Sequence, residues 1–171
     1  MRYFSQILGV SLGLMASCNA QDAQNESNSM EEKTYPVRLT PAQWQDSLSD
    51  EQYYILREKG TERPGTGQYY LHTAEGTYSC AGCGSELFTS DMKFQSHCGW
   101  PSFDREIGGG KVERKLDKSH GMMRTEILCA NCGGHLGHVF NDGPTSTGER
   151  YCVNSLSLQF STVEKEEQSS Q

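Results

Sequence analysis

Two short cysteine motifs constrain the fold of this 171-residue chain more than any other feature. Cys80-Ala81-Gly82-Cys83-Gly84 and Cys129-Ala130-Asn131-Cys132-Gly133 share one spacing, and a glycine follows each. The glycine permits the left-handed conformation of a sharp turn, which points two sulfurs at one place. Two such turns supply four thiolates, the ligand set of a closed tetrahedral zinc site. The sequence therefore predicts one structural Zn²⁺ bound by Cys80, Cys83, Cys129 and Cys132.

A disulfide scaffold and a redox-active CxxC are the alternatives for these cysteines. Disulfides persist in exported proteins, which is the context that the N-terminus suggests. Thioredoxin-type CxxC motifs lie at the start of a helix, whereas these lie among expected strands. Two identical motifs with trailing glycines favour zinc over both alternatives. Because four sulfur ligands leave no open position, the metal is expected to be structural and not catalytic.

The first 17 residues have the order of an export signal. Arg2 is followed by an apolar stretch from Ile7 to Met15 and by small residues up to Cys18. Residues 14–18 resemble a bacterial lipoprotein cleavage site, which implies lipidation of Cys18. A buried or disordered N-terminus is the alternative, but the polar stretch that follows could not continue a core helix. We expect a periplasmic protein or a membrane-anchored lipoprotein of a bacterium.

The rest of the chain divides into a tether, one domain and a tail. Residues 18–33 are predominantly polar and predict a disordered tether, and residues 164–171 predict a polar tail. The folded domain is expected at 34–163. With 18 glycines and 35% hydrophobic residues, its core is modest and a metal would help to hold it together.

Local signals predict a mainly β domain that opens with two short helices. Thr40-Pro41 and Ser49-Asp50 are cap sequences, each with a glutamine three residues after the cap, and Gly60 is the expected cap at the end of the second helix. Beyond Gly65, short runs bounded by turns predict antiparallel strands at 68–71, 76–79, 122–128 and 151–160.

Composition excludes several classes of function. The net charge is −7 and the basic residues are scattered, which argues against a nucleic-acid partner, because such binding needs a positive surface. No apolar run approaches the roughly 20 residues of a membrane-spanning helix. Nothing predicts an interface helix, so we expect a monomer.

Cys98 and Cys152 lie outside the two motifs, and Cys152 has informative neighbours. In an expected strand, Arg150, Cys152 and Asn154 share one face. A guanidinium near a sulfur lowers the thiol pKa and favours the nucleophilic thiolate. The alternative is a buried cysteine acting as a small hydrophobe beside a solvated arginine. The residues alone leave both interpretations open.

His135 and His138 lie three residues apart, just after the second cysteine motif. Histidine can deliver a proton near neutral pH, as a departing oxygen would require. Polar packing around the metal site is equally compatible with the spacing. Zinc ligation is disfavoured, because four cysteines already complete the shell. His72, His97 and His120 are expected to be ordinary surface residues.

Taken in order, the motifs of residues 34–160 resemble the methionine-R-sulfoxide reductases, the B-type enzymes. The resemblance rests on Arg57-Glu58-Lys59-Gly60-Thr61-Glu62-Arg63-Pro64, the two CxxC motifs, Gly99-Trp100-Pro101-Ser102-Phe103, His135-Leu136-Gly137-His138-Val139-Phe140, Asp142-Gly143-Pro144 and Arg150-Tyr151-Cys152-Val153-Asn154-Ser155. It implies two small antiparallel sheets, with the zinc away from the active site.

The resemblance also implies roles for single residues. Cys152 matches the catalytic cysteine, Cys98 the resolving cysteine and Trp100 the aromatic wall that receives the substrate methyl group. Phe140 and Asp142 are further expected substrate-binding residues. The remaining polar positions around the sulfoxide are His135, His138, Arg150 and Asn154.

These roles imply repair of oxidised proteins. Cys152 attacks the sulfoxide sulfur and becomes a sulfenic acid, and Cys98 resolves it to a disulfide that thioredoxin or a thioredoxin-like partner reduces. A non-catalytic zinc module that binds proteins and a general disulfide oxidoreductase remain the rival functions.

Overall fold

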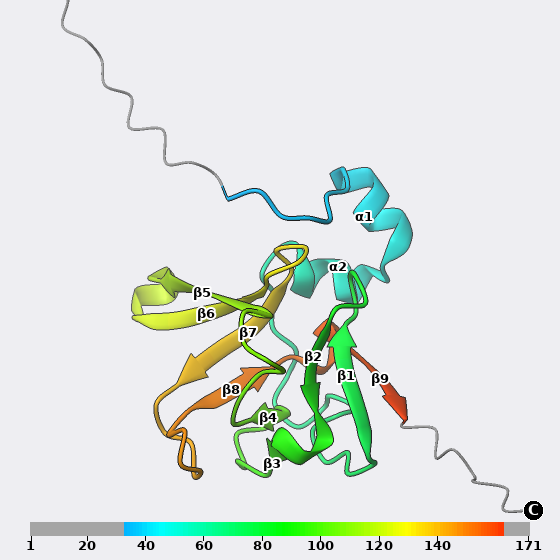
Figure 1. The fold of residues 1–171 in the computed structure, drawn as a ribbon. Helices are drawn as coiled ribbons and strands as arrows, with labels where there is room; N and C mark the ends of the chain where they lie inside the picture. The colour runs from blue at the N-terminus through cyan, green and yellow to red at the C-terminus, as the bar shows by residue number, and fades with distance from the viewer. Residues whose placement is uncertain (1–32, 163–171) are drawn as a thin grey trace, which may run out of the picture. The chain divides into compact units, whose positions relative to one another are not determined.

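The computed structural model describes residues 33–162 (Figure 1). The expected export signal, Cys18, most of the tether and the C-terminal tail lie outside these residues. Within the described part of the chain, no helix has the length and apolar character needed to cross a membrane.

Both expected helices form, because each begins with a complete capping box. They are α1 (Pro41–Ser47) and α2 (Asp50–Leu56). The Thr40 hydroxyl accepts from the Gln43 N–H, and the Gln43 side chain accepts from the Thr40 N–H. Ser49 and Gln52 repeat this exchange at α2. Such caps satisfy amide groups that have no partner within the helix.

The expected cap at Gly60 is wrong. Arg57 is the C-cap of α2, and the left-handed residue is Lys59, with φ 59°. Gly60 instead donates its N–H to the Tyr54 carbonyl at 2.9 Å. A Cβ at Gly60 would lie 2.2 Å from the Tyr54 ring. Gly60 thus lies beyond the C-cap, where its N–H satisfies a carbonyl of the last turn of α2 and its missing side chain leaves room for the Tyr54 ring.

The strands form two antiparallel sheets, as expected. The smaller sheet has the order β2-β1-β9, with β1 (Gly76–Cys80), β2 (Glu86–Thr89) and β9 (Leu158–Thr162). The larger has the order β3-β4-β8-β7-β6-β5. Its strands are β3 (Lys93–Phe94), β4 (Ser102–Phe103), β5 (Val112–Asp117), β6 (Arg124–Cys129), β7 (His135–Phe140) and β8 (Arg150–Val153). Residues 33–162 also form three 3₁₀ turns: η1 (Ser90–Met92), η2 (Ser119–Gly121) and η3 (Ser155–Ser157).

Two of the expected strands differ in the structure. Residues 68–71 form turns, because the amide of Tyr69 bonds to the Ser155 hydroxyl and not to a strand. The run 151–160 is not one strand: β8 ends at Val153, η3 turns the chain, and β9 joins the other sheet. The Glu62 carboxylate accepts the N–H groups of Ser155 and Leu156 at 2.6 and 3.2 Å, which stabilises this turn.

Both sheets contribute aromatic side chains to a shared core. Phe88 of β2 stacks on Phe103 of β4 with 4.3 Å between ring centroids, and Tyr78 and Tyr151 pack around them. All four are buried. Burying a large apolar side chain contributes roughly 2–3 kcal/mol. This packing holds β4 and β8, which carry the candidate site, against the smaller sheet.

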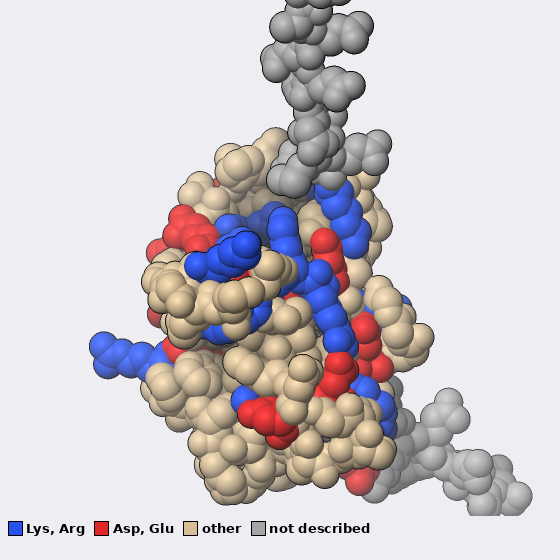
Figure 2. All heavy atoms as spheres, turned by 90° about the vertical axis from the view of Figure 1, so that its left-hand side faces the viewer, with Lys and Arg blue, Asp and Glu red and all other residues tan. Residues whose placement is uncertain are grey.

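His72 is not the surface residue that the sequence predicts. Its Nδ1 lies 2.8 Å from the Tyr78 hydroxyl, and its ring centroid is 4.3 Å from that of Phe160. It belongs to the edge of the aromatic core. Elsewhere on the surface, charges of both signs are interspersed on the face that Figure 2 shows.

Candidate active site and metal centre

The four motif cysteines meet at one point. Cys80 ends β1 and Cys83 lies in the β1–β2 turn, and Cys129 and Cys132 have the same places at β6 and the β6–β7 turn. All four Sγ atoms lie within 4.8 Å of one another. The Sγ atoms of Cys80 and Cys132 are 3.7 Å apart, and those of Cys83 and Cys129 are 3.6 Å apart.

This arrangement fits a zinc ion. Sulfurs bound tetrahedrally at about 2.3 Å from Zn²⁺ lie about 3.8 Å apart. The glycines after the motifs, Gly84 and Gly133, have φ of 74° and 70°, as the turns require. Their N–H groups close the two turns on the carbonyls of Cys80 and Cys129, both at 2.8 Å. The site joins one hairpin of each sheet, and no disulfide links cysteines within residues 33–162.

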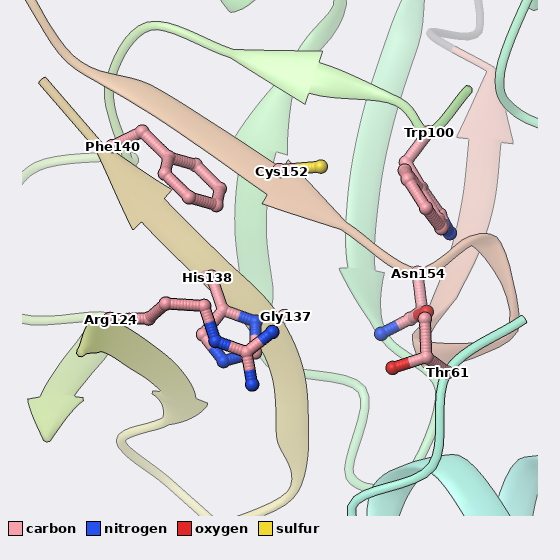
Figure 3. Close-up of a pocket in the computed structure, with 8 residues that line it drawn as sticks. All are labelled: Thr61, Trp100, Arg124, Gly137, His138, Phe140, Cys152 and Asn154. Atoms are coloured by element: carbon pink, nitrogen blue, oxygen red, sulfur yellow. The ribbon is translucent and has the colours of Figure 1, made fainter. Parts of the chain in front are cut away.

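A second group of residues surrounds a small cavity at Cys152 (Figure 3). Its volume is about 130 Å³. The lining residues are Thr61, Trp100, Arg124, Gly137, His138, Phe140, Cys152 and Asn154. Trp100 and Phe140 face the sulfur from opposite sides in Figure 3. None of the four metal-site cysteines lines this cavity.

Gly137 allows the backbones of β7 and β8 to approach each other beside Cys152. A Cβ on Gly137 would lie 2.0 Å from the Cys152 carbonyl oxygen. The pairs His138–Cys152 and Gly137–Val153 fix the register of these strands. The catalytic candidate is therefore placed by sheet pairing and not by a loop.

The two other thiols of the described residues, those of Cys98 and Cys152, are in contact. β4 pairs with β8 so that Ser102 is opposite Cys152, and the chain just before β4 carries Cys98 to the same place. The Sγ atoms of Cys98 and Cys152 are 3.5 Å apart, and both residues are half-buried. A disulfide needs only a short further approach, since its bond length is about 2.05 Å.

The contact between the two sulfurs shifts the pKa values of the two thiols in opposite directions. The hydrogen bond from Cys152 lowers the pKa of Cys98 to about 4, with the hydroxyls of Ser96 and Ser102 acting in the same direction. The same contact, together with burial, raises the pKa of Cys152 above its usual range, and Arg150 only partly opposes this. The expected effect of the guanidinium on Cys152 is present, but its neighbour outweighs it.

Arg150 and Asp142 form an ion pair outside the cavity at Cys152. Arg150 Nε and a terminal nitrogen lie 2.8 and 2.9 Å from the two Asp142 oxygens, and its guanidinium stacks on the Phe140 ring at 4.5 Å. Both residues line a separate cavity of about 290 Å³ that reaches Cys98. Asp142 thus contacts Arg150, and its expected contact with the substrate stays a prediction.

The structure separates the two histidines. His138 lines the cavity, and its Nε2 lies 2.9 Å from Asp117 Oδ2. Burial lowers the pKa of His138, and Asp117 opposes that shift. His135 is 3% exposed and does not line the cavity; its Nδ1 lies 2.8 Å from Glu126, which also binds Lys59.

Asn154 faces the cavity with its amide already engaged. Its Nδ2 donates to the Leu136 carbonyl at 3.1 Å, and its Oδ1 accepts the Glu62 N–H at 3.2 Å. The Glu62 carbonyl accepts the Trp100 Nε1–H at 3.2 Å. Glu62 therefore orients two cavity residues at once.

Sequence reasoning missed several of these contributors. Thr61 and Arg124 line the cavity, Asp117 binds both Arg124 and His138, and Glu62 fixes Trp100. Thr61 and Glu62 lie in a segment with family resemblance, but nothing in their spacing marks a role. Asp117 and Arg124 meet only because β5 and β6 pair in that register.

A mainly β domain that brings four cysteines together where they could hold a metal ion, and places two facing thiols beside an aromatic cavity, has the features of a thiol-containing oxidoreductase. The SelR domain model matches residues 48–162. The peptide methionine sulfoxide reductase MsrB of Leptospira interrogans is 56% identical over 126 residues, covering 74% of this chain and 96% of that protein. Those of Agrobacterium fabrum and Acinetobacter baumannii are each 54% identical, over 135 and 132 residues, and cover 78% and 77% of this chain. The matched residues make up 100% of the Agrobacterium protein and 95% of the Acinetobacter protein. The chain belongs to the MsrB family of peptide methionine sulfoxide reductases.

Proposed function

We propose that this protein reduces methionine-R-sulfoxide in oxidised proteins, with Cys152 as the nucleophile and Cys98 as the resolving thiol. One observation carries the proposal: the Cys152 sulfur borders an aromatic cavity and lies 3.5 Å from a second thiol. The family membership supports the same reaction class. Each sulfoxide epimer requires its own reductase, because the oxidised sulfur is chiral.

The cavity suits a methyl sulfoxide. Trp100 and Phe140 offer apolar surface for the methyl group, and the hydrogen bond to the Glu62 carbonyl holds the indole in place. Cys152 gives up its proton as its sulfur attacks the substrate sulfur, and the sulfoxide oxygen is protonated. The bond between the substrate sulfur and its oxygen breaks, the oxygen passes to the Cys152 sulfur as a hydroxyl group, and methionine leaves. Cys152 is oxidised by two electrons to a sulfenic acid as methionine sulfur is reduced by two.

His138 is the better candidate for the proton donor. It lines the cavity, whereas His135 is buried against Glu126. The bond between Nε2 and Asp117 fixes the ring, and the other nitrogen, Nδ1, has no hydrogen-bond partner among residues 33–162. An imidazolium oriented in this way can donate from Nδ1 while Asp117 stabilises its charge.

Recycling requires a dithiol. Cys98 attacks the oxidised Cys152 sulfur, a disulfide forms and water leaves. An external dithiol, thioredoxin or a thioredoxin-like protein, then reduces that disulfide in two exchange steps. Both cysteines end as thiols, and the partner ends as a disulfide.

Zinc would be held by Cys80, Cys83, Cys129 and Cys132, which supply its complete shell. A closed site of this kind contributes folding free energy by joining the two hairpins. The residues around Cys152 perform the reaction.

We also propose that the protein works outside the cytoplasm, anchored through Cys18. The support is the export-like order of residues 1–18. Cell fractionation of the full chain tests it: the wild type should be found in the membrane fraction, and Cys18→Ser should leave that fraction. A wild type that remains with cytoplasmic markers would exclude this location.

An assay with separated R and S epimers and a chemical dithiol tests the function. The wild type should form methionine from the R epimer only, and Cys152→Ser should form none while keeping one zinc per chain. Cys98→Ser should form one methionine per chain and then stop when thioredoxin is the reductant. Retained activity in Cys152→Ser, or turnover of the S epimer at the same rate, would contradict the assignment.

A further inference from the structure

Cys98 lies among serine hydroxyls that have no role in the reaction steps proposed above. The Ser96 Oγ is 2.9 Å from the Cys98 Sγ, and the Ser102 Oγ is 3.5 Å from it. The two hydroxyl oxygens are 2.7 Å apart. Ser102 is fully buried, and Ser96 is half-buried at the cavity beside Cys98. Two hydroxyl groups thus contact one sulfur and each other.

The protons of this cluster can be followed. The Ser96 Oγ accepts the Cys98 N–H at 3.4 Å, which leaves the Ser96 proton to be donated to the sulfur. The Ser102 proton can go to the sulfur, to the Ser96 Oγ or to the Trp100 carbonyl, which is 3.3 Å away. In every arrangement Ser96 donates to Cys98, and in the first two Ser102 adds to that bond directly or through Ser96. Hydrogen bonds to a charged group favour its charged form.

We propose that Ser96 and Ser102 are positioning residues for the resolving step, which hold the Cys98 sulfur as a thiolate within reach of Cys152. The inference rests on the proposed function and deepens it. A thiolate is the form that attacks a sulfenic acid, so these hydroxyls set the pH range in which the disulfide forms.

The backbone keeps Cys98 in place from both sides. His97 has φ 57° and Gly99 has φ 96°, so two left-handed residues flank the cysteine. A Cβ at Gly99 would lie 2.6 Å from the Pro64 Cβ, and the Gly99 carbonyl accepts the Gly65 N–H at 2.7 Å. Left-handed backbone costs roughly 1 kcal/mol outside glycine, so its use at His97 implies a loop fixed by its surroundings.

The low pKa of Cys98, about 4, has its largest cause in the Cys152 thiol and the next favourable contributions from Ser96 and Ser102. The contribution of Cys152 changes once that sulfur is oxidised. The serine contribution does not depend on the oxidation state of Cys152. The serines can therefore keep Cys98 ionised during the step in which it reacts.

The step balances without a further reactant. The Cys98 thiolate attacks the Sγ of the Cys152 sulfenic acid, the S–S bond forms and the S–O bond breaks. The leaving hydroxide takes a proton from solvent and becomes water. No oxidant is needed in this step, because Cys152 has already given two electrons to the sulfoxide.

Single turnover without reductant tests the proposal in the full-length, zinc-loaded protein. Methionine formed and Cys98–Cys152 disulfide formed are measured in parallel from pH 5 to 9 with methionine-R-sulfoxide. The Ser96→Ala variant should form methionine at the wild-type rate. Its rate of disulfide formation should reach half-maximum at a pH at least about one unit higher than in the wild type. Well below that pH, the variant should be slower than the wild type by a factor of about ten for each unit of this shift. At pH 9 it should equal or exceed the wild type, since a thiolate of higher pKa is the stronger nucleophile.

Three further variants separate ionisation from structure. Ser96→Thr keeps the hydroxyl and should restore the wild-type profile, and Ser102→Ala should shift the profile in the same direction. Ser146→Ala, at an exposed serine of the β7–β8 connection, should change nothing. If Ser96→Ala left the profile unshifted, or slowed the step equally at every pH, the inference would be wrong. If the wild type formed no methionine, the proposed function itself would fail.

Discussion

The Nε2 of His138 lies 2.9 Å from Oδ2 of Asp117, so a carboxylate orients the one histidine that borders the cavity. The same oxygen accepts from Arg124 at 2.6 Å. Asp117 raises the pKa of His138 against the lowering effect of burial. A proton donor needs both this orientation and this charge.

Asp117→Asn should therefore weaken the donor. Without the carboxylate the pKa of His138 falls, so the imidazolium loses its proton at a lower pH than in the wild type. As the pH rises, activity should therefore begin to decline earlier. We expect the alkaline limb of methionine formation to move to lower pH and the rate at pH 7 to fall at least about tenfold. The measurement is single-turnover methionine formation against pH.

Glu126→Gln is the matched control for that variant. Glu126 pairs with His135, which does not line the cavity, and with Lys59. It should lower the free energy of unfolding but leave the pH limb in place. A shift of the limb in Glu126→Gln and not in Asp117→Asn would make His135 the donor.

The features that sequence predicts well are those whose cause is local. The capping boxes at Thr40 and Ser49 involve residues three apart, and α1 and α2 begin where they predict. The CxxC-Gly turns are likewise local, and their shared ligand type predicts that the two turns meet. Such signals need no knowledge of the tertiary fold.

The features that sequence reasoning missed depend on contacts between distant residues. The break after β8 is held by Glu62, which lies 93 residues before Ser155. The separate environments of His135 and His138 depend on which carboxylate of β5 or β6 each one faces. The charge on Cys98 depends on Cys152, 54 residues away. No periodicity or spacing encodes these pairings.

Glu62→Gln should destabilise the protein and misplace the cavity wall. The carboxylate accepts two backbone N–H groups at the turn after β8, and an amide would oppose one of them with its own N–H groups. We expect the free energy of unfolding to fall by about 1–3 kcal/mol. The kcat/KM for the R epimer should fall with zinc retained. Urea unfolding and metal analysis measure both, and unchanged unfolding would show that these bonds contribute nothing.

Removal of the metal should unfold the domain. Because zinc would join the β1–β2 and β6–β7 turns, a strong chelator should release one zinc per chain and lower the melting temperature sharply, with several kcal/mol lost. Cys129→Ser should bind no zinc stably. Cys152→Ser is the control and should keep both its zinc and its melting temperature. A zinc-free protein with wild-type stability would contradict a structural site.

Gly137→Ala should destabilise the active-site strands. The new methyl group would lie 2.0 Å from the Cys152 carbonyl oxygen, which is backbone and cannot rotate away. Separating β7 from β8 should cost at least about 3 kcal/mol of unfolding free energy and displace Cys152 from the cavity. Gly109→Ala is the control: its φ is 76°, but no atom lies within 4 Å of the added Cβ. That variant should lose only about 1 kcal/mol and keep full activity, because it adds backbone strain without a clash. Equal losses in the two variants would mean that conformation, and not strand contact, is why position 137 is glycine.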